Sequence, residues 1–134
     1  MARKRLTTPP DTLSDASASC VPGLEPQRSP CPITSALDLL GDKWTLVVIR
    51  DLLFLEKRRF ADLLSSPEGI STNILAERLD RLEAGGIVER RQYQDHPPRD
   101  EYLLTEKGRE LRPVLAELVR WGLRHIRGTA LPSA

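Results

Sequence analysis

The spacing of apolar residues predicts two helices between Pro32 and Leu55. In the first, apolar side chains recur at helical intervals, Pro32 suits the opening turn and Gly41 suits the end. In the second, Asp42 is placed to cap the helix, and apolar residues from Trp44 to Leu55 cover a wide face. A helix that is apolar over so much of its surface is expected to lie at the centre of the fold.

A short helix and a longer one are predicted next, separated by a turn. The short helix begins at Phe60 and ends at the turn 65–69, and Ser71 then caps a helix that runs to Ala84. A stripe of leucines on the longer helix is expected to be buried. The side chains that point away from this stripe belong to Asn73, Ala76, Glu77, Asp80 and Arg81.

The last third of the chain predicts a hairpin followed by one more helix. Residues 87–93 and 99–104 have the pattern of two strands, and the loop between them holds two prolines that must lie outside the ladder. Thr105 is placed to cap the final helix, in which Pro113 either bends the axis or marks a short preceding turn. Together these elements predict a mainly α fold with a small β-hairpin, an α+β class.

Composition divides the chain into a tail and one domain. The length of 134 residues suits a single domain. Residues 1–30 contain five Pro, four Ser and three Thr with no periodicity, so a flexible N-terminal tail is expected there. The domain is expected over 31–127, and residues 128–134 are expected to fray.

Charge and aromatic content narrow the possible partners. Hydrophobic residues make up 40% of the chain and charged residues 29%, values typical of a globular protein. The formal charge is only +1, and residues 32–104 carry ten basic and thirteen acidic side chains. Bulk charge therefore identifies no partner, and any affinity for DNA must depend on a few aligned arginines. Six aromatic residues are too few for a single-strand stacking platform, so any nucleic acid is expected to be a duplex.

The cysteines and the apolar segments favour a cytoplasmic protein. Only Cys20 and Cys31 occur, which excludes a disulfide-dense secreted fold. The uncharged segment Trp44–Ile49 is far too short to span a bilayer, and no export segment is recognised at the N-terminus.

The order of the predicted elements is that of a winged helix-turn-helix with a long closing helix. In that arrangement the second helix of the motif enters the major groove, and the hairpin lies along the phosphate backbone as a wing. Basic residues flank the motif and lie on the hairpin at Lys57, Arg58, Arg59, Arg90, Arg91 and Arg99. Because neighbouring strand residues face opposite sides, only one of Arg90 and Arg91 is expected to face phosphate.

Several ordered motifs resemble the HxlR-type winged-helix transcriptional regulators of bacteria. They are Cys31-Pro32, Leu39-Leu40-Gly41-Asp42-Lys43-Trp44, Arg58-Arg59-Phe60, Gly69-Ile70-Ser71, Leu79-Asp80-Arg81-Leu82-Glu83, Gly86-Ile87-Val88, Pro97-Pro98-Arg99-Asp100-Glu101-Tyr102 and Leu104-Thr105-Glu106-Lys107-Gly108. The similarity runs from about Cys31 to Gly122. It implies a homodimer formed by the terminal helices that binds a pseudo-palindromic operator, with one recognition helix and one wing on each half-site.

The resemblance also implies site residues. Asn73 is suited to pair with adenine, and Glu77 is suited to accept from cytosine N4. Asp80 is a departure, because many relatives carry a basic residue there. The candidate recognition-helix residues are Ser71, Thr72, Asn73, Glu77, Arg78 and Arg81. The wing and its flanks contribute Arg58, Arg59, Arg90, Arg91, His96 and Arg99, and the dimer interface contributes Leu37, Leu111, Leu115, Leu118 and Trp121.

Cys31 has two interpretations. It precedes Pro32 at a helix start, where the helix dipole favours a thiolate, and some members of the family sense oxidants or electrophiles with a cysteine there. The alternative is a small capping or packing residue. Cys20 lies close enough in sequence to form a disulfide with Cys31 or with a partner subunit, and the alternative is a passive tail thiol. Trp121 either packs in the core or dimer interface or lines a pocket for a small effector.

Other functions are also weighed against DNA binding. Cys20, Cys31, His96 and His125 match no familiar metal-ligand spacing, and no metal or cofactor is expected. No base is recognisably paired with Cys31, so the chain is not expected to be an enzyme. The remaining alternative is a winged-helix module that binds a protein partner without specific DNA binding. Salt distinguishes the two, because phosphate contacts make affinity fall steeply with ionic strength.

Overall fold

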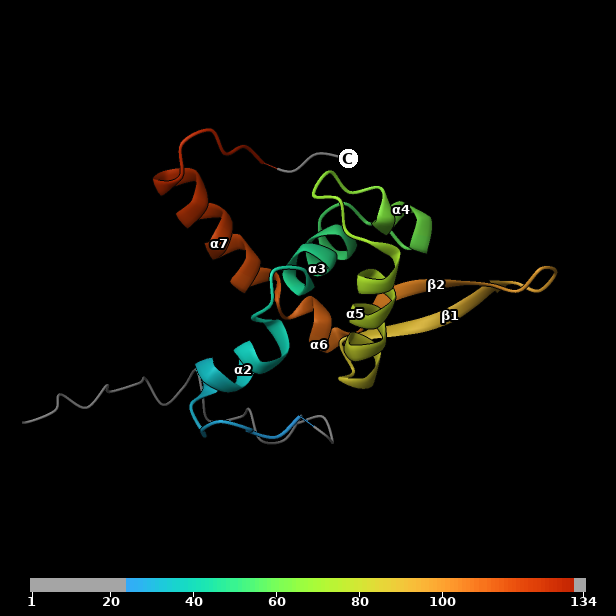
Figure 1. Ribbon diagram of the computed structural model, residues 1–134, viewed down its shortest axis with the longest axis horizontal. Coiled ribbons are helices and arrows are strands. Elements are labelled where there is room, and N and C mark those ends of the chain that lie inside the picture. Colours follow the sequence, from blue (N-terminus) through green and yellow to red (C-terminus); the bar gives the residue numbers. More distant parts are fainter. Residues whose placement is uncertain (1–23, 132–134) are drawn as a thin grey trace, which may run out of the picture.

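The computed structural model describes residues 24–131, and within them helices surround a central helix beside one hairpin (Figure 1). The elements in chain order are α2 Pro32–Leu40, α3 Thr45–Leu53, α4 Phe60–Leu64, α5 Thr72–Ala84, β1 Val88–Gln94, β2 Arg99–Leu104, α6 Glu106–Arg109 and α7 Arg112–His125. The hairpin extends from the body on one side, and α7 projects on the opposite side. The predicted α+β fold class is confirmed.

Helix α3 lies at the centre, as its broad apolar face predicts. It contacts α2, α4, α7 and β2, and Ile49 at its middle has no solvent exposure. The core around it collects aliphatic side chains from nearly every element, together with one tyrosine from β2. Its members are Leu40, Val48, Ile49, Leu52, Leu53, Leu63, Ile70, Leu75, Leu79, Leu82, Ile87, Val88, Tyr102 and Leu115.

Ser71 and Thr105 are the N-caps of α5 and α6, as predicted, whereas the N-cap residue of α3 is Trp44 and not the predicted Asp42. Asp42 still binds the N–H groups at the start of α3. Asp42 Oδ2 accepts hydrogen bonds from the backbone N–H groups of Trp44 (3.1 Å) and Thr45 (3.2 Å). Ser71 Oγ accepts from the N–H of Ile74 at 3.2 Å at the start of α5. Thr105 Oγ1 does the same for the N–H of Gly108 at 3.2 Å. Each cap satisfies a donor that the first turn of a helix leaves without a partner.

The predicted final helix is divided into α6 and α7, so of the two roles considered for Pro113 the short preceding turn is correct. Pro113 stands in the first turn of α7, where its missing N–H costs no hydrogen bond. Gly108 in α6 is required by close packing, because a Cβ there would lie 2.4 Å from the carbonyl oxygen of Ile87. This contact holds α6 against the start of the hairpin.

The hairpin is antiparallel, with Val88 opposite Leu104 and Arg90 opposite Tyr102. Its register shifts between Gln92 and Gln94. Both loop prolines lie in the turn between the strands, as predicted. The N–H of Tyr102 donates to the carbonyl oxygen of Arg58 at 2.7 Å, which ties β2 to the segment that precedes α4.

The segment before α2 contacts that helix through hydrogen bonds of side chains. Within the predicted tail, residues 24–30 form no helix or strand, but Arg28 Nε donates to Asp38 Oδ1 of α2 at 2.6 Å. Ser35 Oγ also donates to the carbonyl oxygen of Ser29 at 3.1 Å. Cys20 lies outside the described residues. No helix within 24–131 is long and apolar enough to cross a membrane.

Candidate nucleic-acid interface

The start of α5 presents polar side chains outward while its leucines anchor it. Ser71, Thr72 and Asn73 are exposed, whereas Leu75 and Leu79 are completely buried. The exposed side chains belong to the cap and the first turn, where hydroxyl and amide groups extend past the end of the helix. Such an end is the part of a recognition helix that reaches base edges in a major groove.

An ion network centred on the buried Asp51 holds the turn between α4 and α5. Asp51 on α3 is only 1% exposed and accepts hydrogen bonds from Arg50 Nε (2.9 Å) and Nη2 (2.8 Å) and from the hydroxyl of Ser66. Lys57 Nζ lies 3.6 Å from the same carboxylate. Arg50 also binds Glu68 at 2.6 and 2.9 Å, and this pairing lowers the pKa of Glu68 to about 2. Because Ser66 and Glu68 belong to the turn, the network fixes the direction in which α5 leaves it.

Arg78 does not share the exposed face of Asn73, although the sequence places it among the recognition-helix candidates. Its Nε donates to Asp42 Oδ2 at 2.7 Å, and its side chain is 20% exposed. Partial burial favours the neutral acid, but hydrogen bonds from Thr45 and Arg78 hold the pKa of Asp42 well below its ordinary value. In the described residues Arg78 therefore ties α5 to the start of α3.

Glu77 and Arg81 remain on the outer side of α5. Glu77 pairs with Arg78, and its Oε1 lies 3.9 Å from Arg81 Nε. Arg81 Nη1 is 4.0 Å from Asp42 Oδ1. Both side chains reach solvent, with exposures of 50% for Glu77 and 37% for Arg81.

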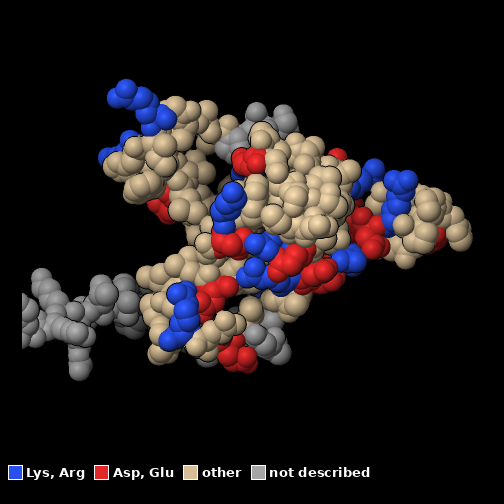
Figure 2. All heavy atoms as spheres, viewed as in Figure 1, with Lys and Arg blue, Asp and Glu red and all other residues tan. Residues whose placement is uncertain are grey.

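Three arginines of the hairpin and its flank are engaged by neighbouring side chains, and the other candidate residues there are exposed. Arg59 lies over the ring of Tyr93 at 4.5 Å, and Arg91 Nη2 binds Glu101 Oε1 at 2.9 Å. Arg90 faces α5 on the other side of the strand. Arg58, His96 and Arg99 are exposed. Figure 2 shows acidic and basic side chains interleaved over the middle of this face.

The candidate interface leucines divide into buried and exposed positions. Leu115 is 6% exposed and belongs to the core of the protomer, and Leu111 packs against that core. Leu37, Leu118 and Trp121 are 49%, 50% and 59% exposed. Ile33 and Val114, which the predicted interface does not include, are also exposed and lie four residues before Leu37 and Leu118.

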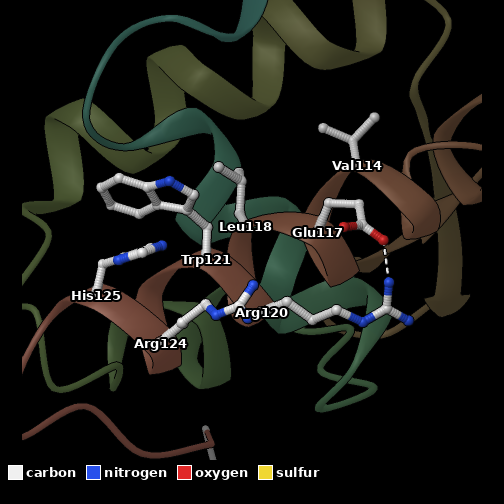
Figure 3. A pocket seen from close by; sticks show the side chains of 7 residues that line it. All are labelled: Val114, Glu117, Leu118, Arg120, Trp121, Arg124 and His125. Carbon is white, nitrogen blue, oxygen red and sulfur yellow. Dashed lines mark hydrogen bonds and ion pairs between the residues drawn. The ribbon is translucent and has the colours of Figure 1, made fainter.

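The exposed side of α7 forms an open groove of about 660 Å³ around Trp121 (Figure 3). The ring centroids of Trp121 and His125 lie 5.1 Å apart, and Glu117 forms an ion pair with Arg120 on the same helix. The residues that line this groove all belong to α7, namely Val114, Glu117, Leu118, Arg120, Trp121, Arg124 and His125. The groove is therefore a shallow surface of one helix, not an enclosed chamber between helices.

Comparisons with known proteins agree with this geometry. The sequence model of the HxlR-like helix-turn-helix family matches residues 39–129. The chain belongs to this family. The HTH-type transcriptional regulator sll1512 of Synechocystis is 46% identical over 92 residues, which cover 69% of this chain and 67% of that protein.

Solved structures give the same result. The reduced form of the transcriptional regulator YodB from Bacillus subtilis is similar with a TM-score of 0.60 and 36% identity, over 75% of this chain and 98% of that one. The reduced form of the redox regulator HypR has a TM-score of 0.64 and 34% identity, over 72% and 95% of the two chains. The predicted winged-helix architecture of an HxlR-like protein is confirmed.

In this HxlR-like chain, Cys31 is an exposed thiol at the N-cap of α2 and forms no disulfide within residues 24–131. The pKa of Cys31 is lowered, chiefly because the backbone N–H of Thr34 stabilises the thiolate, with help from the Thr34 hydroxyl and the N–H of Ile33. A thiol that ionises more readily reacts faster with electrophiles. The geometry thus supplies exposure and a stabilised thiolate together.

The turn network is the part of the HxlR-like site that sequence reasoning missed. The available signal was the charged pair Arg50-Asp51 inside an otherwise apolar helix. A charge that interrupts a buried face requires a partner, because burying an unpaired carboxylate is strongly unfavourable. The partners Ser66 and Glu68 lie in a turn more than a dozen residues away, and no local pattern identifies them.

Proposed function

We propose that this chain regulates transcription by binding duplex DNA as a homodimer on a pseudo-palindromic operator. The observation that carries the proposal is the exposed polar start of α5, held by a buried turn network beside a projecting hairpin. Membership of the HxlR-like family and the transcriptional-regulator relatives support it.

In the proposed complex, α5 enters the major groove by its first turn. Asn73 pairs with adenine, Ser71 and Thr72 contact phosphate or base edges, and Glu77 accepts from cytosine. The hairpin follows the backbone, with Arg58, His96 and Arg99 supplying phosphate contacts. Arg78 has no direct role in this scheme, because its contact with Asp42 is needed to position α5.

The dimer in this proposal is completed by the exposed apolar faces of α2 and α7. Leu37, Leu118 and Trp121 provide the contacts, together with Ile33 and Val114. Large apolar side chains that are exposed together on a surface often mark a site where a partner binds. A two-fold axis through this face would place two copies of α5 on successive half-sites.

Footprinting of the intergenic DNA beside the gene tests the proposal, and fluorescence anisotropy then measures affinity for the protected duplex. Asn73→Ala is expected to weaken operator binding by about tenfold to a hundredfold, the loss of one bidentate base contact. Gln27→Ala removes an exposed amide from the segment before α2 and serves as the matched control. Binding that does not change between 50 and 300 mM KCl would exclude phosphate contacts and favour the protein-interaction module.

The same proposal includes control of DNA binding through Cys31. Similar solved structures include the oxidized form of HypR and the diamide-treated form of YodB, with 35% and 37% identity to this chain. Treatment with diamide or a quinone is expected to change operator affinity of the wild-type protein and to leave Cys31→Ser unaffected. Equal sensitivity of Cys31→Ser and wild type would refute the thiol mechanism. Cys20→Ser distinguishes a disulfide with Cys20, which this variant abolishes, from modification of Cys31 alone, which it leaves intact.

A further inference from the structure

Arg90 lies among three carboxylates at the junction of α5 and the hairpin. Its Nη2 is 3.2 Å from Asp80 Oδ1, its Nε is 3.8 Å from Glu83 Oε2, and its Nη1 is 3.9 Å from Asp100 Oδ2. The guanidinium also lies over the ring of Tyr102 at 5.3 Å. Two of the carboxylates come from α5 and one from β2, so acidic side chains of both elements share the single guanidinium of Arg90.

The junction reaches solvent and carries excess negative charge. The side chain of Asp80 is 69% exposed, and those of Glu83, Asp100 and Arg90 are 42%, 41% and 37% exposed. One positive charge facing three negative ones leaves two uncompensated carboxylates beside the helix and the wing that meet DNA in the proposed function. A phosphate that approaches Arg90 must therefore displace Asp80 and face repulsion from Glu83.

We propose that Asp80 and Glu83 keep Arg90 away from the phosphates of DNA of unrelated sequence, so that these two acidic residues of α5 lower nonspecific affinity. The inference rests on the proposed function, since it concerns how the same surface treats different DNA. Where base contacts hold the backbone in register, a phosphate is held close enough to compete for Arg90. On unrelated DNA nothing holds it there.

The consequence is a measurable difference in salt dependence. Affinity for unrelated duplex DNA comes almost entirely from phosphate contacts, and each contact steepens the fall of log K with log salt by about 0.9. If Asp80 and Glu83 keep Arg90 from phosphate, replacing Asp80 adds one phosphate contact to the complex with unrelated DNA. Replacing Arg90 in the wild-type protein is then expected to leave the affinity for unrelated DNA almost unchanged.

Anisotropy titrations of a fluorescent 30-base-pair duplex of mixed sequence, at KCl concentrations from 50 to 200 mM, test this. Asp80→Asn is expected to raise affinity about threefold to fivefold near 0.1 M KCl, the range of one exposed ion pair. Its salt slope is expected to steepen by about 0.9. Glu89→Gln is the matched control, since Glu89 is exposed on the opposite face of β1 and loses the same charge.

The pair of residues is tested by a double-mutant cycle. Arg90→Gln alone is expected to change nonspecific affinity by less than about twofold, and Asp80→Asn/Arg90→Gln is expected to lose the gain of the single Asp80 variant. Circular dichroism melts confirm that each variant folds, which the exposure of these side chains favours.

Two results would overturn the inference alone. One is an equal rise in affinity for Glu89→Gln and Asp80→Asn, which would indicate bulk charge. The other is an equal loss from Arg90→Gln in the presence and absence of Asp80, which would show that Arg90 already binds phosphate. A wild-type protein that binds no duplex at 50 mM KCl would overturn the proposed function together with the inference.

Discussion

Helices α5 and α7 are similar in length but differ in how much of their apolar surface one protomer covers. In α5, Leu75, Leu79 and Leu82 have no exposure at all. In α7, Leu115 is buried, while Leu118 and Trp121 remain half or more exposed. The apolar side of α5 is therefore covered within one chain, whereas α7 leaves apolar surface exposed, as the proposed dimer requires.

The largest expected effect is on stability, from truncating the anchor of α5. Leu79→Ala removes a fully buried side chain and is expected to lower the free energy of unfolding by about 2–5 kcal/mol, measured by urea denaturation. Leu118→Ala is the matched variant on α7. At protein concentrations low enough to dissociate a dimer, Leu118→Ala is expected to lower the free energy of unfolding by about 0.5 kcal/mol or less. Equal costs at low concentration would remove the distinction between the helices.

The next effect is on self-association, from truncating the centre of the α7 face. Trp121→Ala is expected to weaken dimerisation by about 2 kcal/mol or more, because a large aromatic side chain is lost from both copies of a two-fold interface. Sedimentation velocity over a concentration series measures it. Arg127→Ala, an exposed residue just beyond the helix, is the control. A Trp121→Ala protein that dimerises like wild type would place the interface elsewhere.

A smaller effect on stability is expected when the pH is lowered, because acid breaks an ion pair in the turn between α4 and α5. The ion pair with Arg50 lowers the pKa of Glu68 from 4.5 to about 2. Its contribution to stability is therefore complete above pH 4.5 and is lost as the pH falls toward 2. Glu68→Gln is expected to flatten this part of the stability curve, measured by urea unfolding between pH 5 and 2. An unchanged curve would mean that the pair does not stabilise the turn.

The smallest effect is expected at the surface of the hairpin. Arg91 and Glu101 form an ion pair in which the arginine is 59% exposed. Arg91→Gln is expected to change the free energy of unfolding by about 0.5 kcal/mol or less. A thermal melt measures this, and a loss as large as that of Leu79→Ala would mean that the hairpin depends on its surface charges.

Much of the fold was predictable because its causes are local. Ser71 and Thr105 cap helices through atoms three residues away, and periodicity alone identifies which side of α5 is buried. The division at Pro113 was predicted only as one of two outcomes. The close approach of Gly108 to Ile87, which packs α6 against the start of the hairpin, involves residues distant in sequence and was not predictable.

The candidate site was less predictable, because charged side chains choose partners in space. Arg78 and Arg90 both belonged to the predicted DNA-binding set. Arg78 is paired with Asp42 from the other end of the motif, and Arg90 is paired with Asp80 and Glu83. Sequence order gives no information on which of many nearby carboxylates an arginine meets.

The order of residues along the chain is enough to predict the elements, most of their caps, the buried face of each helix and the resemblance to a family. These depend on spacing within a few residues and on the strong preference of apolar side chains for the interior. Contacts between distant elements establish which arginines are engaged by carboxylates, which turn Asp51 holds, and how much of the apolar surface of α7 stays exposed in one chain. Those outcomes depend on distances between elements, because ion pairs and packing act only at contact.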